Sequence, residues 1–297
     1  MDVLQFNALG VVPVELQVQK ILDHLSHTHS AQSITIMIHG YLFNYGDKIH
    51  CPHSTLFHPN KIKDTFRTRS WPYELKPFAN GNIAIGFSWP SRSRLKKAYR
   101  TAQIAASELA QLIKRIRYSN PKIRINVMAH SLGARVVFEA FHHLAPGDIK
   151  RIILLYPAEY KIPAEKALDT HLGRNAEILY VTSNENLIFE WFFSMCRLAG
   201  ISAGPAFGIY EPDRFNVAKI DLTNKNLIFA LRKHDICIGR KGRFTCHWSA
   251  YTRKGIFQLY AAWLFNPDRV SLFDLQKIIA ECEINVPSQS SESRLPA

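Results

Sequence analysis

The sequence of 297 residues has few cysteines and no long uninterrupted apolar segment, and these two deficits exclude several classes of protein. Its five cysteines are scattered, odd in number and without a C-x-x-C pair, so no disulfide framework is expected and a reducing, cytoplasmic location is predicted. The most apolar region, residues 187–209, is interrupted by Glu190 and Arg197 and broken again by Gly204-Pro205, which argues against a membrane span. The N-terminus lacks the basic segment and apolar block of a secretory signal.

Acidic residues are also scarce, since 24 Asp and Glu stand against 37 Lys and Arg and leave a formal net charge of +13. Such a charge favours anionic partners but does not define a fold. The hydrophobic fraction of 47% excludes a disordered chain and supplies a buried core. Because no repeat, low-complexity segment or polar linker divides the chain, a single domain over residues 1–286 is predicted, followed by a short flexible tail at 287–297.

Short apolar runs of strand length recur along the chain, and several are nearly continuous in Ile, Val and Leu, as is typical of strands covered on both faces. The runs are Ile34–Ile38, Ile83–Ser88, Ile123–Met128, Ile152–Tyr156, Ile178–Thr182 and Phe215–Leu222. Helical spacing of apolar residues is found at Val14–Leu25, Tyr99–Ile116, Leu132–Leu144, Arg253–Leu264 and Leu272–Ala280. This alternation predicts an α/β fold with a mainly parallel central sheet flanked by helices.

Two connections, 40–82 and 182–215, are too long for ordinary turns, and long excursions in compact domains are usually lids or binding loops. The second is rich in large apolar side chains, namely Trp191, Phe192, Phe193, Met195, Phe207 and Tyr210. Two hypotheses explain these apolar side chains: they belong to a helix packed on the core, or they form an apolar surface that receives an acyl chain.

The strongest local motif is Ala129-His130-Ser131-Leu132-Gly133, which follows a predicted strand and directly precedes a predicted helix. A small-x-Ser-x-Gly turn in this setting holds a serine in a strained conformation with its hydroxyl above the sheet. Gly133 meets the need for a small flanking residue, and Ala129 stands where glycine is commoner. The first amides of the helix point at a negative oxygen formed beside the serine. Ser131 is therefore a candidate nucleophile.

The chain resembles the alpha/beta-hydrolase superfamily and, within it, bacterial esterase- and lipase-like serine hydrolases of unknown function. Four segments carry the resemblance: His39-Gly40-Tyr41, Phe87-Ser88-Trp89-Pro90-Ser91, Ala129–Gly133 and His247-Trp248-Ser249-Ala250-Tyr251. The resemblance implies an alpha/beta-hydrolase fold with long loop insertions and catalytic residues in the order Ser, acid, His. It implies no cofactor and no metal.

The resemblance also implies roles for individual residues. His247, after the final strand, is the expected base that takes the serine proton and later gives it to the leaving group. His234 is the alternative base, and His130 is expected to support the site from beside the nucleophile. The backbone N–H groups of Tyr41 and Leu132 are the expected donors to the oxyanion.

The acid of the relay is expected in the loop after the penultimate strand, Ser183-Asn184-Glu185-Asn186. Glu185 is the first candidate, because its carboxylate would hold the imidazole tautomer and stabilise the imidazolium. Most relatives use aspartate at this point. Glu190, on the next helical turn, and Glu159, after the preceding strand, are the alternatives.

Two groups of histidine and cysteine raise the alternative of a metal site. They are His50, Cys51, His53 and His58, and His234, Cys237, Cys246 and His247. Neither group has the close paired spacing of common structural zinc sites, and ligation by His247 would remove the base. No metal site is predicted, and the first group is expected to contact substrate or to order its loop.

Basic residues are concentrated between Arg92 and Arg124, where ten Lys and Arg are accompanied by one acid, Glu108. Nine of the thirteen net charges therefore lie in this segment. A solvated helix face explains the cluster, and so does an anionic membrane surface or an acidic ligand. No nucleic-acid-binding motif is recognised, so nucleic acid is not an expected partner.

Together these residues predict a serine hydrolase of a carboxylic ester, esterase- or lipase-like and extending to thioesters, which forms an acyl-enzyme that water releases. An acyltransferase with the same three residues is one alternative, because a pocket that excludes water passes the acyl group to another alcohol. The other alternative is a hydrolase-like scaffold that has lost turnover and only binds.

Overall fold

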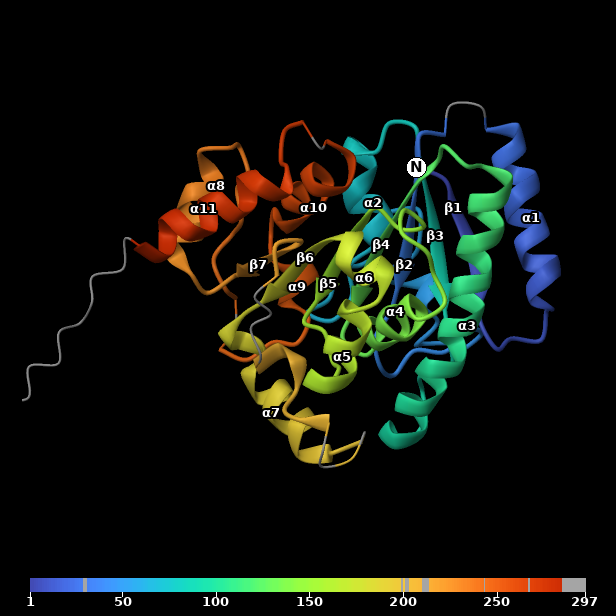
Figure 1. The fold of residues 1–297 in the computed structure, drawn as a ribbon, viewed down its shortest axis with the longest axis horizontal. Coiled ribbons are helices and arrows are strands. Elements are labelled where there is room, and N and C mark those ends of the chain that lie inside the picture. The colour runs from blue at the N-terminus through green and yellow to red at the C-terminus, as the bar shows by residue number, and fades with distance from the viewer. Residues whose placement is uncertain are drawn as a thin grey trace, which may run out of the picture.

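The computed structural model describes residues 1–28, 31–198, 200, 203–209, 214–242, 244–266 and 268–284. A seven-stranded sheet, parallel in every pairing, forms the centre in the order β1-β3-β2-β4-β5-β6-β7 (Figure 1). Its strands are β1 (Val3–Asn7), β2 (Ser33–Ile38), β3 (Asn82–Ser88), β4 (Arg124–His130), β5 (Arg151–Leu155), β6 (Glu177–Thr182) and β7 (Val217–Asp221). The predicted parallel sheet flanked by helices is confirmed. The predicted tail at 287–297 lies outside the described residues.

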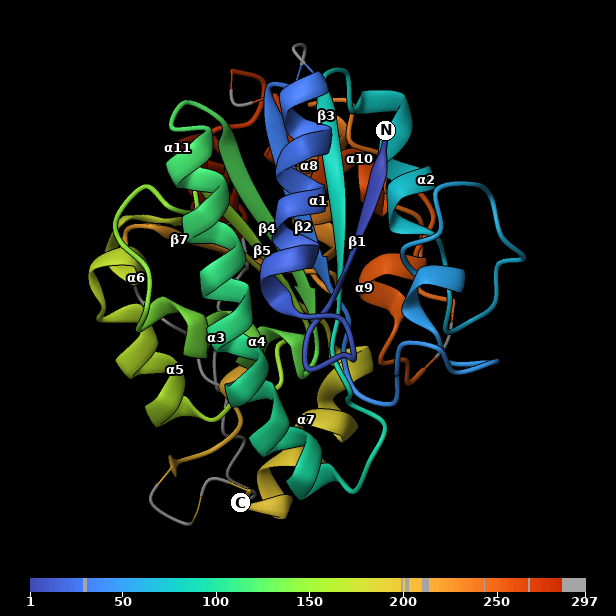
Figure 2. The same ribbon diagram turned by 90° about the vertical axis from the view of Figure 1, so that its right-hand side faces the viewer.

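Helices cover both faces of the sheet (Figure 2). One layer contains α1 (Val14–His27), α3 (Leu95–Ser119), α4 (Gly133–Phe141), α5 (Lys161–Leu168) and α6 (His171–Asn175). The other contains α2 (Trp71–Leu75), α8 (Lys225–Arg232), α9 (Ser249–Thr252), α10 (Ile256–Phe265) and α11 (Leu272–Ile284). The remaining helix, α7 (Leu187–Cys196), lies beyond the carboxyl ends of the strands (Figure 2).

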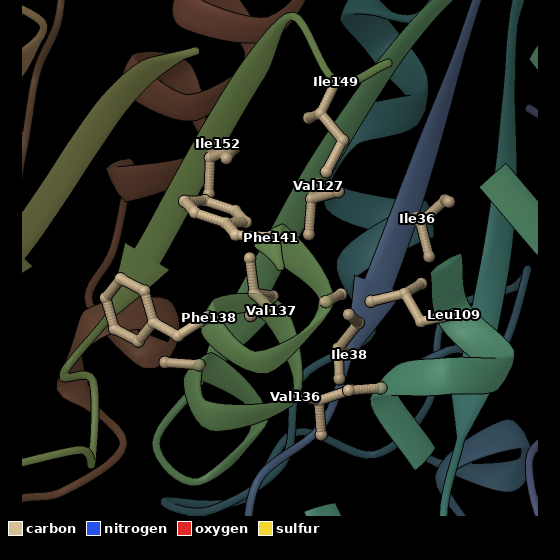
Figure 3. Close-up of a cluster of buried hydrophobic side chains, with 14 of the residues drawn as sticks. Ile36, Ile38, Leu109, Val127, Val136, Val137, Phe138, Phe141, Ile149 and Ile152 are labelled. Carbon is tan, nitrogen blue, oxygen red and sulfur yellow. The ribbon is translucent and has the colours of Figure 1, made fainter. Parts of the chain in front are cut away.

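Both faces of the sheet are buried because helices cover each of them, and successive side chains of a strand enter the two apolar clusters in turn. On one face, Ile36 of β2 and Val127 of β4 belong to the same apolar cluster as Val137 of α4 (Figure 3). On the other face, Met37 and Met128 belong to the cluster that includes α10. This two-sided burial explains why the strands appear in the sequence as continuous apolar runs.

Strand β1 was not among the predicted strands. Its five residues are mostly half-buried and form no continuous apolar run, since it lies at the edge of the sheet beside β3, with Val3 opposite Ala84. The strand predicted to end at Tyr156 ends instead at Leu155, because Tyr156 has a positive φ of 46°. The chain therefore turns out of the sheet at Tyr156, directly after the carboxyl end of β5.

The long connection between β2 and β3 packs on the sheet rather than standing away from it. Leu56, Phe57 and Trp71 are buried in the same apolar cluster as Met37 of β2. A Cβ on Gly86 of β3 would lie 2.9 Å from the ring of Phe57, so a glycine at this position lets Phe57 pack directly on the strand. None of the helices in the described ranges has the length and apolarity that crossing a membrane requires.

Candidate active site

Ser131 occupies the turn between β4 and α4, with a φ of 52° that residues other than glycine rarely adopt. Its N–H donates to the carbonyl of Leu155 at 2.9 Å, and its carbonyl accepts from Ala134 at 2.9 Å and Ala158 at 3.0 Å. These backbone hydrogen bonds hold the strained turn on both sides. The side chain is 4% exposed and lines a cavity at the carboxyl ends of the strands.

Two glycines bring the end of β2 against this turn. A Cβ on Gly133 would lie 2.6 Å from the carbonyl oxygen of His39, and one on Gly40 would lie 2.9 Å from Cβ of Ser131. Because no larger residue fits at either position without a shift of the chain, both glycines are needed for this close approach. The backbone after β2 therefore runs directly beside Ser131.

His247 lies next to Ser131, 116 positions away in the sequence, with its Nε2 2.7 Å from the serine Oγ. Its ring stacks on Phe189 at a centroid distance of 4.8 Å. Burial, assisted by the nearby ring of His130, lowers the pKa of His247 well below its usual value of 6.5. The imidazole is therefore neutral near pH 7, and a neutral imidazole can accept the serine proton.

The other ring nitrogen of His247 meets an amide. Its Nδ1 lies 2.6 Å from Oδ1 of Asn186, and Nδ2 of Asn186 donates to Oε1 of Glu190 at 2.8 Å. A carboxylate accepts but does not donate, so Glu190 orients the amide with its NH₂ group toward the carboxylate and its oxygen toward the imidazole. His247 then carries its proton on Nδ1, which leaves the lone pair of Nε2 facing the serine hydroxyl.

Glu185, the expected acid, faces away from His247. Its Oε2 forms a buried ion pair with Arg253 and also accepts from the hydroxyl of Ser183 at 3.3 Å. Its backbone carbonyl accepts the N–H of Cys246 at 2.9 Å, which ties the segment before His247 to this turn. The structure thus places the side chain of Asn186, not that of Glu185, on the imidazole, because the intervening 3₁₀ turn rotates adjacent side chains apart.

The two alternative acids have different surroundings. Glu159 is fully buried and bonded to Tyr99 Oη and Arg135 Nη1, both at 2.6 Å, so it joins α3 to α4 rather than contacting His247. Glu190 reaches His247 only through Asn186. Burial raises the pKa of Glu190, while the amide of Asn186 opposes that rise by stabilising the charged carboxylate.

The remaining histidines support the site or lie outside it. Nε2 of His130 donates to the carbonyl of His247 at 2.8 Å, and burial lowers the pKa of His130 to about 4. His130 therefore stays neutral and fixes the backbone that carries the neighbouring imidazole. His234, the alternative base, is exposed after α8 and does not line the cavity that contains Ser131.

The expected oxyanion donors both border the cavity. Within the described parts of the chain, neither the N–H of Tyr41 nor that of Leu132 donates a hydrogen bond. The loop that carries Tyr41 is held by Ser91, whose hydroxyl lies 2.9 Å from the carbonyl oxygens of both Gly40 and Phe43 and accepts from the N–H of Phe43. These two amides are therefore free to bind a negative oxygen beside Ser131.

A cavity of about 290 Å³ opens beside Ser131 and His247. Its walls are mainly apolar and come from the loop after β2, the turn after β5 and helix α7, with contributions from Leu42, Leu95, Pro157, Phe189, Phe192 and Trp248. The lining includes the cation Arg67, whose guanidinium lies 4.8 Å from the ring of Trp248. Such a lining suits an apolar chain better than a charged ligand.

The candidate metal groups do not assemble. Among the described residues, no cluster of three or more His, Cys, Asp or Glu side chains is placed to hold a metal ion. Nε2 of His53 lies 2.8 Å from Oδ1 of Asn7, so in the first group this histidine holds its loop against the end of β1. None of the five cysteines forms a disulfide.

Sequence reasoning missed Asn186, Phe189 and Tyr156. The amide of Asn186 carries no titratable group, so a search for an acid passes over it. Tyr156 carries its own signal, since it ends an apolar run beside a proline; in the structure its hydroxyl lies 2.7 Å from Oγ of Ser249.

Residues 15–162 match the protein family described as alpha/beta hydrolase of unknown function (DUF900). Among curated proteins, none matches the chain. A solved structure of Trichoderma reesei cutinase, in complex with a C11Y4 phosphonate inhibitor, is similar at 15% identity and a TM-score of 0.30, over 50% of this chain and 68% of that one. A lipase-esterase related protein from Clostridium acetobutylicum is similar at 8% identity and a TM-score of 0.40, over 79% of this chain and 95% of that one.

Proposed function

We propose that this chain, which belongs to the alpha/beta-hydrolase superfamily, is a serine hydrolase of carboxylic esters, with Ser131 as nucleophile and His247 as general base. The observation that carries the proposal is the 2.7 Å contact between Ser131 Oγ and His247 Nε2 at a strained strand-to-helix turn. A hydroxyl and a neutral imidazole at this distance meet the geometric requirement for an activated nucleophile. The apolar cavity beside them supports an acyl chain as the bound group.

The proposed reaction has two halves. First, Oγ of Ser131 attacks the ester carbonyl while Nε2 of His247 takes the hydroxyl proton, and the amides of Tyr41 and Leu132 bind the negative oxygen. The bond from carbon to the alcohol oxygen then breaks, and His247 gives its proton to the departing alcohol. In the second half, water gives a proton to His247 and attacks the acyl carbon. The bond to Oγ breaks, Ser131 recovers its proton, and the carboxylic acid leaves.

Asn186 contacts Nδ1 of the imidazole, where enzymes that use this reaction ordinarily have a carboxylate. Replacing the aspartate of a serine-protease triad with asparagine costs about 10⁴-fold in kcat, because the imidazole then takes the wrong tautomer. Here Glu190 fixes the amide so that its oxygen faces Nδ1, and the productive tautomer is retained. The absence of a charge directly on the imidazole favours the second candidate function, a scaffold that binds esters without turnover.

Hydrolysis of p-nitrophenyl esters over a series of acyl-chain lengths separates the two candidates. The proposal predicts that Ser131→Ala and His247→Ala each lower kcat/KM by at least about 10³-fold. His234→Ala is the matched control, since this histidine is exposed and outside the cavity, and it is expected to retain the wild-type rate. A folded wild-type chain with no turnover above that of Ser131→Ala would favour the binding scaffold.

A further inference from the structure

Helix α7 presents an apolar face to solvent. Five large side chains, at spacings that place them on one side of the helix, are between 49% and 63% exposed: Leu187, Ile188, Trp191, Phe192 and Met195. The opposite side buries Glu190 and Phe193. A surface helix normally turns its polar side to water, so the polarity of α7 is inverted, and an exposed apolar face of this kind marks a contact surface.

Cations without partners lie next to this face. Arg94, Lys96, Lys97 and Arg100 are exposed at the beginning of α3, and in the described part of the chain none of them forms an ion pair. Basic side chains in the first turn oppose the positive end of the helix dipole, so their position is unfavourable for the helix itself. The first acid that follows these four cations in the sequence is Glu108, which lies more than two turns of α3 beyond Arg100.

The two surfaces meet at the mouth of the cavity. The ring of Tyr99 in α3 lies 6.3 Å from that of Phe193 in α7, and Leu95 and Phe192 line the same cavity. Helix α7 and the beginning of α3 lie at the same end of the molecule in both orientations (Figures 1 and 2). An ester entering the cavity from this side passes between an apolar face and a cluster of cations.

We propose that the α7 face and the first turns of α3 together dock on an anionic lipid surface, so that the cavity opens toward the membrane. An apolar helix face inserts among acyl chains, and neighbouring cations are attracted to anionic headgroups. The surface favours lipid over a protein partner because the first turn of α3 contains no acid and Glu190, the acid of α7, is buried on the opposite side of that helix. The substrate class that follows, an ester delivered from a lipid layer, rests on the proposed function, whereas the docking does not.

The proposed docking surface includes the basic residues of segment 92–124 that lie at the beginning of α3 and leaves out those at its far end. Helix α3 has 25 residues and is about 37 Å long. Lys114 and Lys122 lie at or beyond its far end, and Arg117 there donates to the carbonyls of Pro121, Ile123 and Gly147, which gives it a structural role. The beginning of α3, and not its far end, lies at the same end of the molecule as α7 (Figures 1 and 2).

Sedimentation with vesicles tests the docking. The full chain carries Ser131→Ala, so that binding is measured without hydrolysis of the lipid. We expect binding to vesicles of phosphatidylcholine mixed with phosphatidylglycerol, weaker binding to phosphatidylcholine alone, and a loss of binding at high salt. Neutralising Lys96 and Lys97 to Gln is expected to weaken binding about 25-fold, or about fivefold for each charge. The matched control, Lys114→Gln with Lys122→Gln, removes the same charge and is expected to bind like the parent.

The apolar half of the surface is tested by Ile188→Ser with Trp191→Ser, which leaves the cavity lining intact. We expect a loss of vesicle binding of at least tenfold and no blue shift of tryptophan emission, with an unchanged far-UV spectrum. Absence of binding to anionic vesicles, or an equal loss in the far-end control, overturns the proposal. So does a concentration-dependent dimer, seen without vesicles and abolished by this pair, because the face would then bind a second copy. Vesicle binding by the Ser131→Ala chain, together with a wild-type chain that hydrolyses no ester, would instead contradict the proposed function and leave the docking standing.

Discussion

At the scale of single residues, a row of hydrogen bonds joins Ser131, His247, Asn186 and Glu190 at distances of 2.7, 2.6 and 2.8 Å. Only the last member is a carboxylate, and it is separated from the imidazole by a neutral amide. The second carboxylate oxygen of Glu190 has no hydrogen-bond partner among the described residues, so Asn186 is the main hydrogen-bond partner of this carboxylate. Since no carboxylate touches the imidazole, burial dominates its pKa and favours the neutral ring.

The first prediction concerns Asn186→Asp. A carboxylate on Nδ1 favours the imidazolium, so it raises the pKa of His247, and the pH below which activity is lost rises with it, by about one unit or more. The introduced carboxyl group and Glu190 would share one proton, which moves the negative charge from Glu190 to the oxygen that His247 contacts. The measurement is kcat/KM for a soluble ester as a function of pH, with the wild-type acid limb expected well below pH 6.5.

Asn184→Asp is the control for this experiment. Asn184 belongs to the same turn but is exposed, so the same chemical change is made away from the imidazole. An acid limb that Asn186→Asp leaves unchanged, or that both substitutions shift equally, would contradict the hydrogen-bonded row.

The sequence predicts part of this row. The strand-turn-helix motif marks Ser131, and the position after the last strand marks His247; their catalytic roles stay predictions, although the structure brings the two side chains into contact. The sequence does not reveal that Glu185 pairs with Arg253 while Asn186 faces the imidazole. Neighbouring positions in a short turn point in different directions, and nothing in their chemical type indicates which one faces inward.

At the scale of elements, the site depends on how closely the end of β2 approaches the turn between β4 and α4. Gly133, at the first position of α4, lies against the carbonyl oxygens of Ile38 and His39 at distances that leave no room for a methyl group. The amide of Leu132 is fixed by the same turn, so displacement of the turn moves an expected oxyanion donor.

Gly133→Ala is therefore expected to lower kcat/KM by at least about tenfold and to lower Tm, because the added Cβ would lie 2.6 Å from a carbonyl oxygen. Gly242→Ala is the matched control, since a Cβ there meets no atom within 4 Å and its φ is not positive. The measurements are ester hydrolysis and thermal unfolding of both variants. Wild-type activity in Gly133→Ala would show that the close approach is not needed.

Helix α7 illustrates what periodicity does and does not determine. A helix packed on the core is one of the two hypotheses for this segment; the structure has a helix here, but most of its large apolar side chains are exposed. Spacing alone does not say which side is buried, because both sides carry apolar residues. The side with Glu190 turns inward since Asn186 offers the carboxylate a buried donor, and the opposite side is left in solvent.

At the scale of the whole molecule, short apolar runs predict six of the seven strands, and their alternation with helices predicts a mainly parallel sheet. They do not predict the strand order, and the polar, half-buried edge strand β1 gives no such run. The parallel arrangement places the carboxyl ends of β2, β3, β4, β5 and β6 at one edge, which is where ligands bind in open α/β sheets. The basic residues of this segment fall into two groups in the sequence, 92–100 and 114–124, and the length of α3 separates the group at the mouth of the cavity from the group at the far end.

Covalent labelling with a fluorophosphonate, followed by mass spectrometry of the digested chain, shows whether Ser131 is a nucleophile activated by His247. We expect one adduct, on the peptide containing Ser131, with labelling abolished in Ser131→Ala, strongly slowed in His247→Ala and unchanged in His234→Ala. A folded wild-type chain that takes up no label, or that is labelled equally well without the Ser131 hydroxyl, would contradict that role of Ser131.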